Sequence, residues 1–243
     1  PESGIRLLTT RAQKAQMLER LGVETLIEIG FTREFAATPA EEFSRAFLHD
    51  RLMPREVRIG ANFRFGEGRR GDLGFLEQMG AELGFDVVGM RPVMDNGDAI
   101  SSTRVRGRVA EGDVSEAWRL LGRPYFVDGN VFSGERMGRQ IGFPTLNVSL
   151  DNELIPAQGV YVTAVHIPSF GRLFPSVTNY GVRPTVYEDY PATLESHLLD
   201  FTADVYEEPV RVFFLARLRA EMVFPNSMAL TAQIRRDVEA ARA

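Results

Sequence analysis

The chain has 243 residues, of which 44% are hydrophobic and 25% are charged, and its net charge is −5 at pH 7. The acidic balance excludes a basic nucleic-acid footprint, and no apolar run reaches the roughly 18 residues that a membrane span needs. The chain contains no cysteine, which excludes disulfides, thiolate nucleophiles and cysteine-ligated zinc. These properties predict a cytoplasmic protein long enough for two domains.

The first half of the chain alternates helical and strand-like patterns. Helices are predicted at residues 11–21, 40–52, 73–84, 103–109 and 114–121, and buried strands at 23–29, 56–59 and 86–90. This alternation predicts a parallel sheet with crossover helices, hence an α/β domain. Because such a fold normally begins with a strand, we expect that the N-terminal part of this domain is incomplete.

The pattern changes after the turn at residues 122–124, which predicts domains at 1–122 and 123–243. Beyond the turn, short strands are predicted at residues 125–131, 160–167, 172–178, 193–201 and 210–218. Several short strands separated by turn residues indicate a small antiparallel barrel. A helix at residues 227–241 is predicted to close the chain, with its apolar residues on one face.

Lys14 is the only lysine among 28 basic residues. The lysine-containing phosphate loop and kinases built on a strand lysine are therefore excluded. An ATP site in this chain would have to use arginines, backbone N–H groups and a metal. A genomic preference for arginine explains the count itself more simply, but the exclusion holds in either case.

A glycine-rich segment leads into Thr145 and Asn147, whose oxygens share one face if the backbone is extended. A hydroxyl and an amide oxygen are hard ligands, suited to Mg²⁺ that bridges ATP phosphates. Glycine also lets backbone N–H groups approach phosphate oxygens closely. The alternative is an ordinary turn with a surface threonine and asparagine. The residues predicted to shape the ATP site are Gly134, Gly138, Gly142, Pro144 and Thr145.

Glu195 lies in a predicted strand in which Thr193, Glu195 and His197 share one face. A carboxylate placed near a substrate hydroxyl could accept its proton during phosphoryl transfer. The alternative is a glutamate that simply faces solvent. No chemistry is assigned to His197, and the three histidines of the chain have no metal-ligand spacing.

Three further segments suggest ligand contacts. The loop around Arg183 could face an anion or a planar ring, and the loop at residues 60–72 mixes aromatic residues, glycines and arginines. Hydroxyls and an arginine at residues 101–104 precede a helix, where free N–H groups attract anions. Plain loops and a simple helix cap explain the same residues.

The order of the motifs is more specific than any one of them. Six motifs follow one another at residues 62–66, 100–104, 120–125, 142–147, 179–185 and 194–201. Together they resemble the bacterial bifunctional riboflavin kinase/FMN adenylyltransferase family, over nearly the whole chain. The resemblance implies a Rossmann-like nucleotidyltransferase domain followed by a riboflavin kinase barrel, with riboflavin, FMN and ATP as substrates and FAD as the final product.

For the kinase domain, the resemblance implies that Glu195 is the catalytic base and that Thr145 and Asn147 meet Mg²⁺ and ATP phosphate. Leu146 stands where the family usually has alanine, and we expect its side chain to point away from the two ligands. The flavin-side residues implied by the resemblance are Asn179, Arg183 and Thr185.

For the adenylyltransferase domain, the resemblance implies a set of nucleotide- and flavin-binding residues. They are Asn62, Phe63, Arg64, Phe65, Ser102, Thr103 and Arg104. The family's opening strand with its ATP-binding histidines is absent, since no histidine precedes His49. We therefore expect this stretch of chain to make FMN but little FAD. The alternatives are a non-catalytic flavin- or nucleotide-binding module with the same fold, and a different nucleotidyltransferase with an appended barrel.

Overall fold

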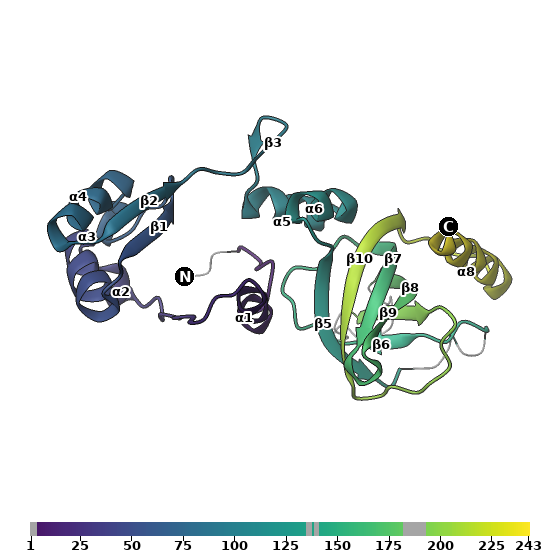
Figure 1. Ribbon diagram of the computed structural model, residues 1–243. Helices are drawn as coiled ribbons and strands as arrows, with labels where there is room; N and C mark the ends of the chain where they lie inside the picture. Colours follow the sequence, from purple (N-terminus) through teal and green to yellow (C-terminus); the bar gives the residue numbers. More distant parts are fainter. Residues whose placement is uncertain (1–3, 135–137, 139–140, 182–192) are drawn as a thin grey trace. The chain divides into compact units, whose positions relative to one another are not determined.

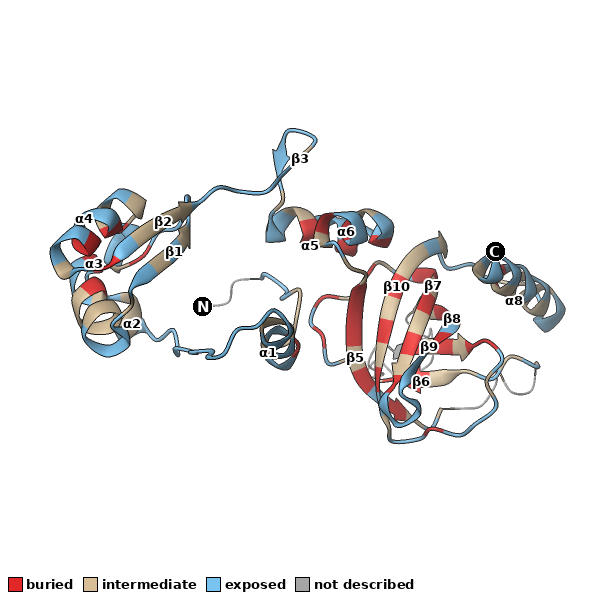
Figure 2. Cartoon of the chain, viewed as in Figure 1, coloured by how far each residue is buried: buried red, intermediate tan, exposed pale blue. Residues whose placement is uncertain are grey.

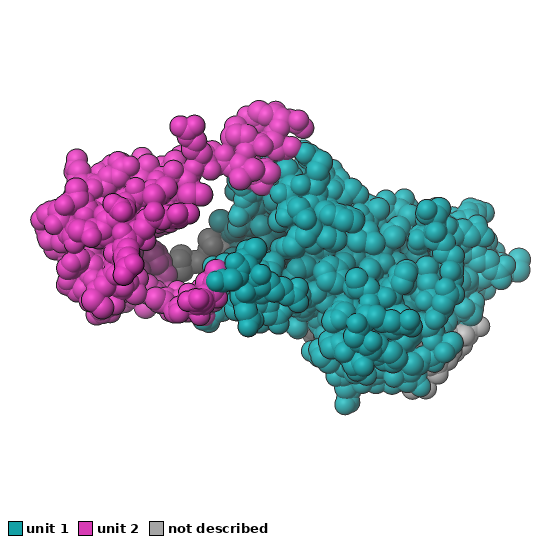
Figure 3. Space-filling view, in the orientation of Figure 1, with its two compact units in different colours: residues 1–22, 101–243 teal, residues 23–100 magenta. Residues whose placement is uncertain are grey.

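The structure is a computed structural model that describes all residues except 1–3, 135–137, 139–140 and 182–192. The chain forms two compact units, one of residues 1–22 with 101–243 and one of residues 23–100 (Figure 3). The domain boundary predicted after residue 122 refers to the two catalytic activities and not to these compact units, and it stays a prediction.

The unit of residues 23–100 contains the parallel strand pair that the sequence predicts. Strands β1 (Glu56–Gly60) and β2 (Asp86–Met90) pair in parallel and are connected through helix α4 (Leu73–Leu83). Asp72 caps α4 by accepting a hydrogen bond from the Phe75 N–H, and Gly84 ends it in the left-handed region at φ 87°. The remaining elements are α2 (Arg33–Ala36), α3 (Ala40–Glu42), the π-helix η1 (Phe43–Leu52), η2 (Glu67–Arg69), β3 (Met94–Asp95) and β4 (Asp98–Ala99).

The predicted strand at residues 23–29 is wrong. This segment forms no strand, and the apolar side chains of Val23, Leu26, Ile27 and Ile29 are exposed. A strand exists only where a neighbouring strand accepts and donates its backbone hydrogen bonds. Within the described residues no strand pairs with this segment, so an apolar run alone was not sufficient to make one.

The unit of residues 1–22 and 101–243 is built on a closed barrel whose strands follow the order β10-β5-β6-β9-β8-β7. All of these neighbouring pairs are antiparallel. The predicted α/β region and antiparallel barrel are confirmed (Figure 1). The strands are β5 (Tyr125–Phe132), β6 (Leu146–Val148), β7 (Gly159–Ile167), β8 (Arg172–Gly181), β9 (Thr193–Leu198) and β10 (Pro209–Arg219).

Alternation along the barrel strands separates an apolar interior from the outer surface (Figure 2). A chain of hydroxyls also lies inside the barrel. The Oγ1 of Thr163 is 2.7 Å from the Oγ of Ser176 and 2.6 Å from the Oγ1 of Thr178, which is 2.8 Å from the Oγ of Ser196. These buried hydroxyls satisfy one another, as buried polar groups must.

Helices cover the outside of the barrel. Helix α6 (Val114–Leu121) packs against β10 and β5, α5 (Ser102–Glu111) packs against α6, and the predicted C-terminal helix α8 (Ser227–Arg242) packs against β8. A 3₁₀ turn, η3 (Pro168–Phe170), links β7 to β8. Asp237 of α8 is buried and accepts hydrogen bonds at 3.1 and 2.8 Å from the Arg219 guanidinium of β10.

Helix α1 (Arg11–Arg20) lies far from the barrel in sequence but docks beside β5 through buried amides. The side chain of Gln13, only 1% exposed, donates to Asn152 at 2.7 Å and accepts from it at 3.0 Å. Asn152 also accepts a hydrogen bond from the Asp128 N–H at 3.0 Å. Arg211 connects Asp128 to Gln16 of the same helix. This paired amide fixes α1 as part of the barrel unit.

Candidate active site

Three residues predicted from the sequence lie in one row across neighbouring strands of the barrel. Asn147 of β6 is directly opposite Glu195 of β9, and Glu195 is directly opposite Asn179 of β8. Residues that are opposite in antiparallel strands project from the same face of the sheet. The barrel register therefore gathers an amide, a carboxylate and a second amide from three separate parts of the sequence.

Strand β9 separates this row from the barrel interior. Leu194, Ser196 and Leu198 are buried, whereas Glu195 and His197 between them are partly exposed. Leu146 is opposite Ser196, in the row next to Asn147. Leu146 therefore projects from the opposite face to Asn147, as expected for the position where the resembled family usually has alanine.

The glycines of the predicted ATP segment pack closely around the two candidate ligands. A Cβ on Gly134 would lie 2.4 Å from the Nδ2 of Asn147 and 2.8 Å from its Oδ1. A Cβ on Gly138 would lie 2.4 Å from the Phe143 carbonyl oxygen and 3.4 Å from the Oγ1 of Thr145. Any side chain at these two positions would displace the groups beside Thr145 and Asn147.

Gly142 has a different role. Its φ is +85°, in the left-handed region that favours glycine, and a Cβ there would meet open space. The Phe143 N–H donates a hydrogen bond to the Gly138 carbonyl at 2.8 Å, which closes the turn. The glycine at 142 therefore turns the chain into the following Pro144, and it does not make room for a neighbour.

His197 contacts the same turn from β9. Its Nδ1 is 2.8 Å from the carbonyl oxygen of Pro144, and its ring meets the Phe143 ring edge to face with centroids 5.4 Å apart. Because a carbonyl only accepts hydrogen bonds, the Nδ1 atom carries the proton. Sequence reasoning assigned no role to His197, since only the folded barrel brings it to Pro144.

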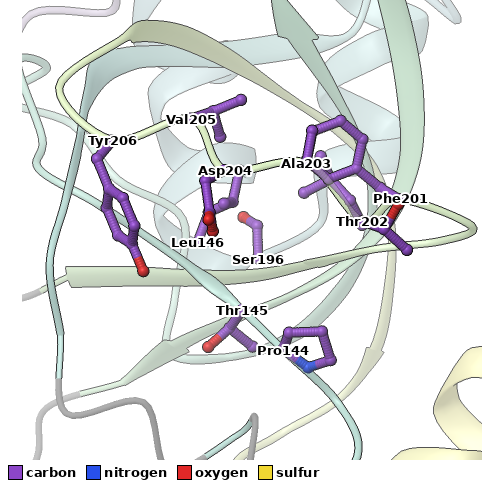
Figure 4. A pocket seen from close by; sticks show the side chains of 11 residues that line it. Pro144, Thr145, Leu146, Ser196, Phe201, Thr202, Ala203, Asp204, Val205 and Tyr206 are labelled. Carbon is purple, nitrogen blue, oxygen red and sulfur yellow. The ribbon is translucent and has the colours of Figure 1, made fainter.

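A cavity of about 340 Å³ adjoins Thr145 and is lined by Leu146, Ser196 and Leu198, on the face of β6 and β9 opposite to Glu195. Figure 4 shows Pro144 and Thr145 along one side and the loop of residues 201–206 along the other. Asp204 and Tyr206 extend from this loop toward β6 and β9. Sequence reasoning did not identify this loop as part of a cavity, because only the closed barrel brings it opposite Pro144 and Thr145.

Just after β9, Asp200 forms an ion pair with Arg242 of α8. Asp200 accepts hydrogen bonds from the Arg242 guanidinium at 2.7 and 2.9 Å. This hydrogen bonding lowers the pKa of the Asp200 carboxyl, with a smaller contribution from the charge of His197. Asp200 is therefore held ionised three residues after His197.

The predicted metal ligands are chemically suited to Mg²⁺ but are few. Thr145 offers a hydroxyl and the buried Asn147 an amide oxygen, both hard donors. No group of three or more histidine, aspartate or glutamate side chains that could hold a metal exists in the described part of the chain. A Mg²⁺ ion there would depend on substrate phosphates for most of its ligands, as is usual for this metal.

Two predicted flavin-side residues, Arg183 and Thr185, lie outside the described residues.

On the adenylyltransferase side, Ser102 and Thr103 are exposed in the first turn of α5. Arg104 donates its N–H to the capping Ser101 at 3.3 Å, and its side chain lies 3.7 Å from Glu116. The exposed Ser102 and Thr103 in this turn are compatible with anion binding as well as with a plain cap.

The predicted flavin-side loop of the other unit is divided between core and surface. Phe65 is 7% exposed and belongs to the core with Leu76 and Phe85, so its packing is structural. Phe63 stacks on Phe65 and is 43% exposed. Asn62 is exposed, and Arg64 pairs with Asp72 at 3.2 Å. The exposed members of this set are available to a ligand, but Phe65 is not.

None of the described helices has the length and apolar character needed to cross a membrane.

Two family models match the chain: riboflavin kinase over residues 121–243 and FAD synthetase over residues 1–104. The first covers the barrel and the second covers the α/β region. The segment 1–104 includes helix α1, which packs in the barrel unit.

Curated relatives agree with both matches. The bifunctional riboflavin kinase/FMN adenylyltransferase of Pseudomonas fluorescens is 41% identical over 91% of this chain and 71% of its own length. The enzyme of the same name from Escherichia coli K12 is 39% identical over 97% of this chain and 74% of its own length. A solved structure described as a macrolide-efflux protein from Streptococcus pneumoniae is 32% identical, with a TM-score of 0.88 over 97% of this chain and 75% of that one.

The resemblance inferred from six ordered motifs is confirmed by these matches, which extend over both regions of the chain. The efflux description belongs to the streptococcal protein and has no counterpart in the two family matches. This chain is a member of the bifunctional riboflavin kinase/FMN adenylyltransferase family, the enzymes of FAD biosynthesis.

Proposed function

We propose that the barrel phosphorylates riboflavin with ATP, and that Glu195 is the catalytic base. The observation that carries the proposal is the row of Asn147, Glu195 and Asn179 across three neighbouring strands. In the reaction the terminal ribityl oxygen forms a bond to the γ-phosphorus of ATP, and the bond from that phosphorus to the ADP oxygen breaks. Glu195 accepts the hydroxyl proton, which gives FMN and ADP.

The neighbours of Glu195 provide the positioning. Thr145 and Asn147 contribute oxygens to Mg²⁺, which when bound neutralises charge on the ATP phosphates. Gly134, Gly138, Gly142 and Pro144 shape the chain around the phosphates, and Asn179, with Arg183 and Thr185, contacts the flavin.

We also propose that residues 62–64 and 102–104 take part in joining FMN to the AMP part of ATP, with release of diphosphate. The support is chemical: exposed polar and aromatic side chains in one unit, and exposed hydroxyls in the first turn of a helix in the other, where the helix dipole favours an anion. The two segments belong to different compact units. The expected weakness of FAD formation stays a prediction.

One experiment tests the kinase assignment. The chain is incubated with riboflavin, ATP and Mg²⁺, and the flavins are separated by chromatography. We expect FMN, and a fall in turnover of about 10²–10⁴-fold for Glu195→Gln with near-normal riboflavin binding. Glu208→Gln is the matched control, since Glu208 lies outside the row. Unchanged turnover in Glu195→Gln would remove it from the mechanism, and abundant FAD would contradict the predicted weak adenylylation.

A further inference from the structure

We infer that His197 is a positioning residue for the kinase reaction, acting through the Pro144 carbonyl on the candidate metal ligand Thr145. The inference rests on the proposed role of Thr145. It begins from the 2.8 Å contact between the His197 Nδ1 and the Pro144 carbonyl oxygen. That carbonyl belongs to the peptide unit whose N–H is that of Thr145.

Because residue 144 is a proline, this hydrogen bond determines the orientation of the peptide that leads into Thr145. The ring of Pro144 fixes its own φ, so the remaining backbone freedom at this residue is rotation about ψ. Rotation about ψ swings the Pro144 carbonyl and, with it, the plane of the peptide that leads into Thr145. A hydrogen bond to that carbonyl holds the plane and therefore the direction in which Thr145 leaves it.

Phe143, the residue before Pro144, is held by two contacts of its own. The Phe143 N–H donates to the Gly138 carbonyl at 2.8 Å, and the Phe143 ring contacts the His197 ring edge to face. Since an edge-to-face ring pair has a preferred geometry, it restrains the imidazole against the turn. His197 is therefore attached to the turn in two separable ways, by its hydrogen bond to the Pro144 carbonyl and by its ring contact with Phe143.

Strand β9 links this attachment to the proposed base. His197 follows Glu195 by two residues, so both side chains project from the same face, and both are partly exposed. The strand that carries the base therefore also sets the position of the segment that carries Thr145. Two groups that must act on one phosphate are held in register by a single strand.

Two substitutions separate the parts of the attachment. His197→Phe keeps an aromatic ring against Phe143 but removes the donor, whereas His197→Asn keeps an N–H donor at the position of Nδ1 but removes the ring. We expect His197→Phe to raise the Mg²⁺ concentration for half-maximal FMN formation about tenfold, since lost support of a ligand typically costs that much. His197→Asn should remain within about twofold of the wild type.

Thr145→Val decides whether a failure belongs to His197 or to the metal site. If Thr145→Val leaves the Mg²⁺ dependence unchanged, the proposed role of Thr145 is wrong and the inference about His197 falls with it. If Thr145→Val shifts the Mg²⁺ dependence and His197→Phe does not, only the inference about His197 is overturned. Equal shifts in His197→Phe and His197→Asn, with equal melting temperatures, would also overturn it, because the donor would then not matter.

Discussion

Gly134→Ala is the substitution whose effect follows most directly from the structure. The added Cβ would lie 2.4 Å from the Asn147 Nδ2, whereas ordinary contact begins at 3.4 Å. The amide must therefore recede by about 1 Å, and a displacement of that size near a reacting centre costs about 100-fold in rate. This corresponds to about 2.7 kcal/mol of transition-state stabilisation.

The assay is the initial rate of FMN formation at several concentrations of ATP and Mg²⁺. Gly107→Ala in α5 is the matched control, because a Cβ there meets open space, and its kcat/KM should equal that of the wild type. Wild-type kcat/KM in Gly134→Ala, with a normal melting temperature, would refute the reasoning. It would mean that the Asn147 amide moves freely or has no part in the reaction.

Three further predictions concern stability. Gln13→Ala should lower the free energy of unfolding by about 1–3 kcal/mol, because the buried Asn152 amide loses both hydrogen bonds to Gln13 and keeps only the one from the Asp128 N–H. The control Gln16→Ala should stay within about 0.5 kcal/mol in denaturant titrations. Asp237→Ala should cost about 3 kcal/mol, because the largely buried Arg219 guanidinium loses its carboxylate, and an unchanged melting temperature would contradict this. Arg242→Ala should destabilise the protein at pH 7 but not in acid, because Arg242 lowers the pKa of the Asp200 carboxyl. The stabilisation by this ion pair is present above the unfolded pKa of about 3.9 and is lost as the pH falls through the folded pKa. Unfolding curves of both proteins at pH 7 and pH 2 measure this difference.

Local signals were sufficient to predict most of the fold. Thr10, Asp72 and Asn226 cap helices that begin where the sequence predicts, and alternating apolar residues marked five of the six barrel strands. The exception is β6, which is only three residues long and too short to show alternation. The wrong strand at residues 23–29 had a strand-like composition but no partner among the described residues.

The candidate site could be predicted only in part, for a related reason. The sequence identifies Asn147 and Glu195 by chemical type and order, but their opposition depends on the barrel register, which is a property of paired strands. The contact of His197 with Pro144 joins residues 53 positions apart. No local pattern in the chain records such a contact.

The docking of α1 also constrains the order in which this protein folds during synthesis. Gln13 is made early, but its partner Asn152 follows 139 residues later. Residues 23–100 are all synthesised before any barrel strand has left the ribosome, and domains generally fold as units during synthesis. Helix α1 must therefore wait, with its Gln13 side chain still hydrated, until β5 and the segment after β6 have emerged, so a helix that is made early docks only after much later residues have been synthesised.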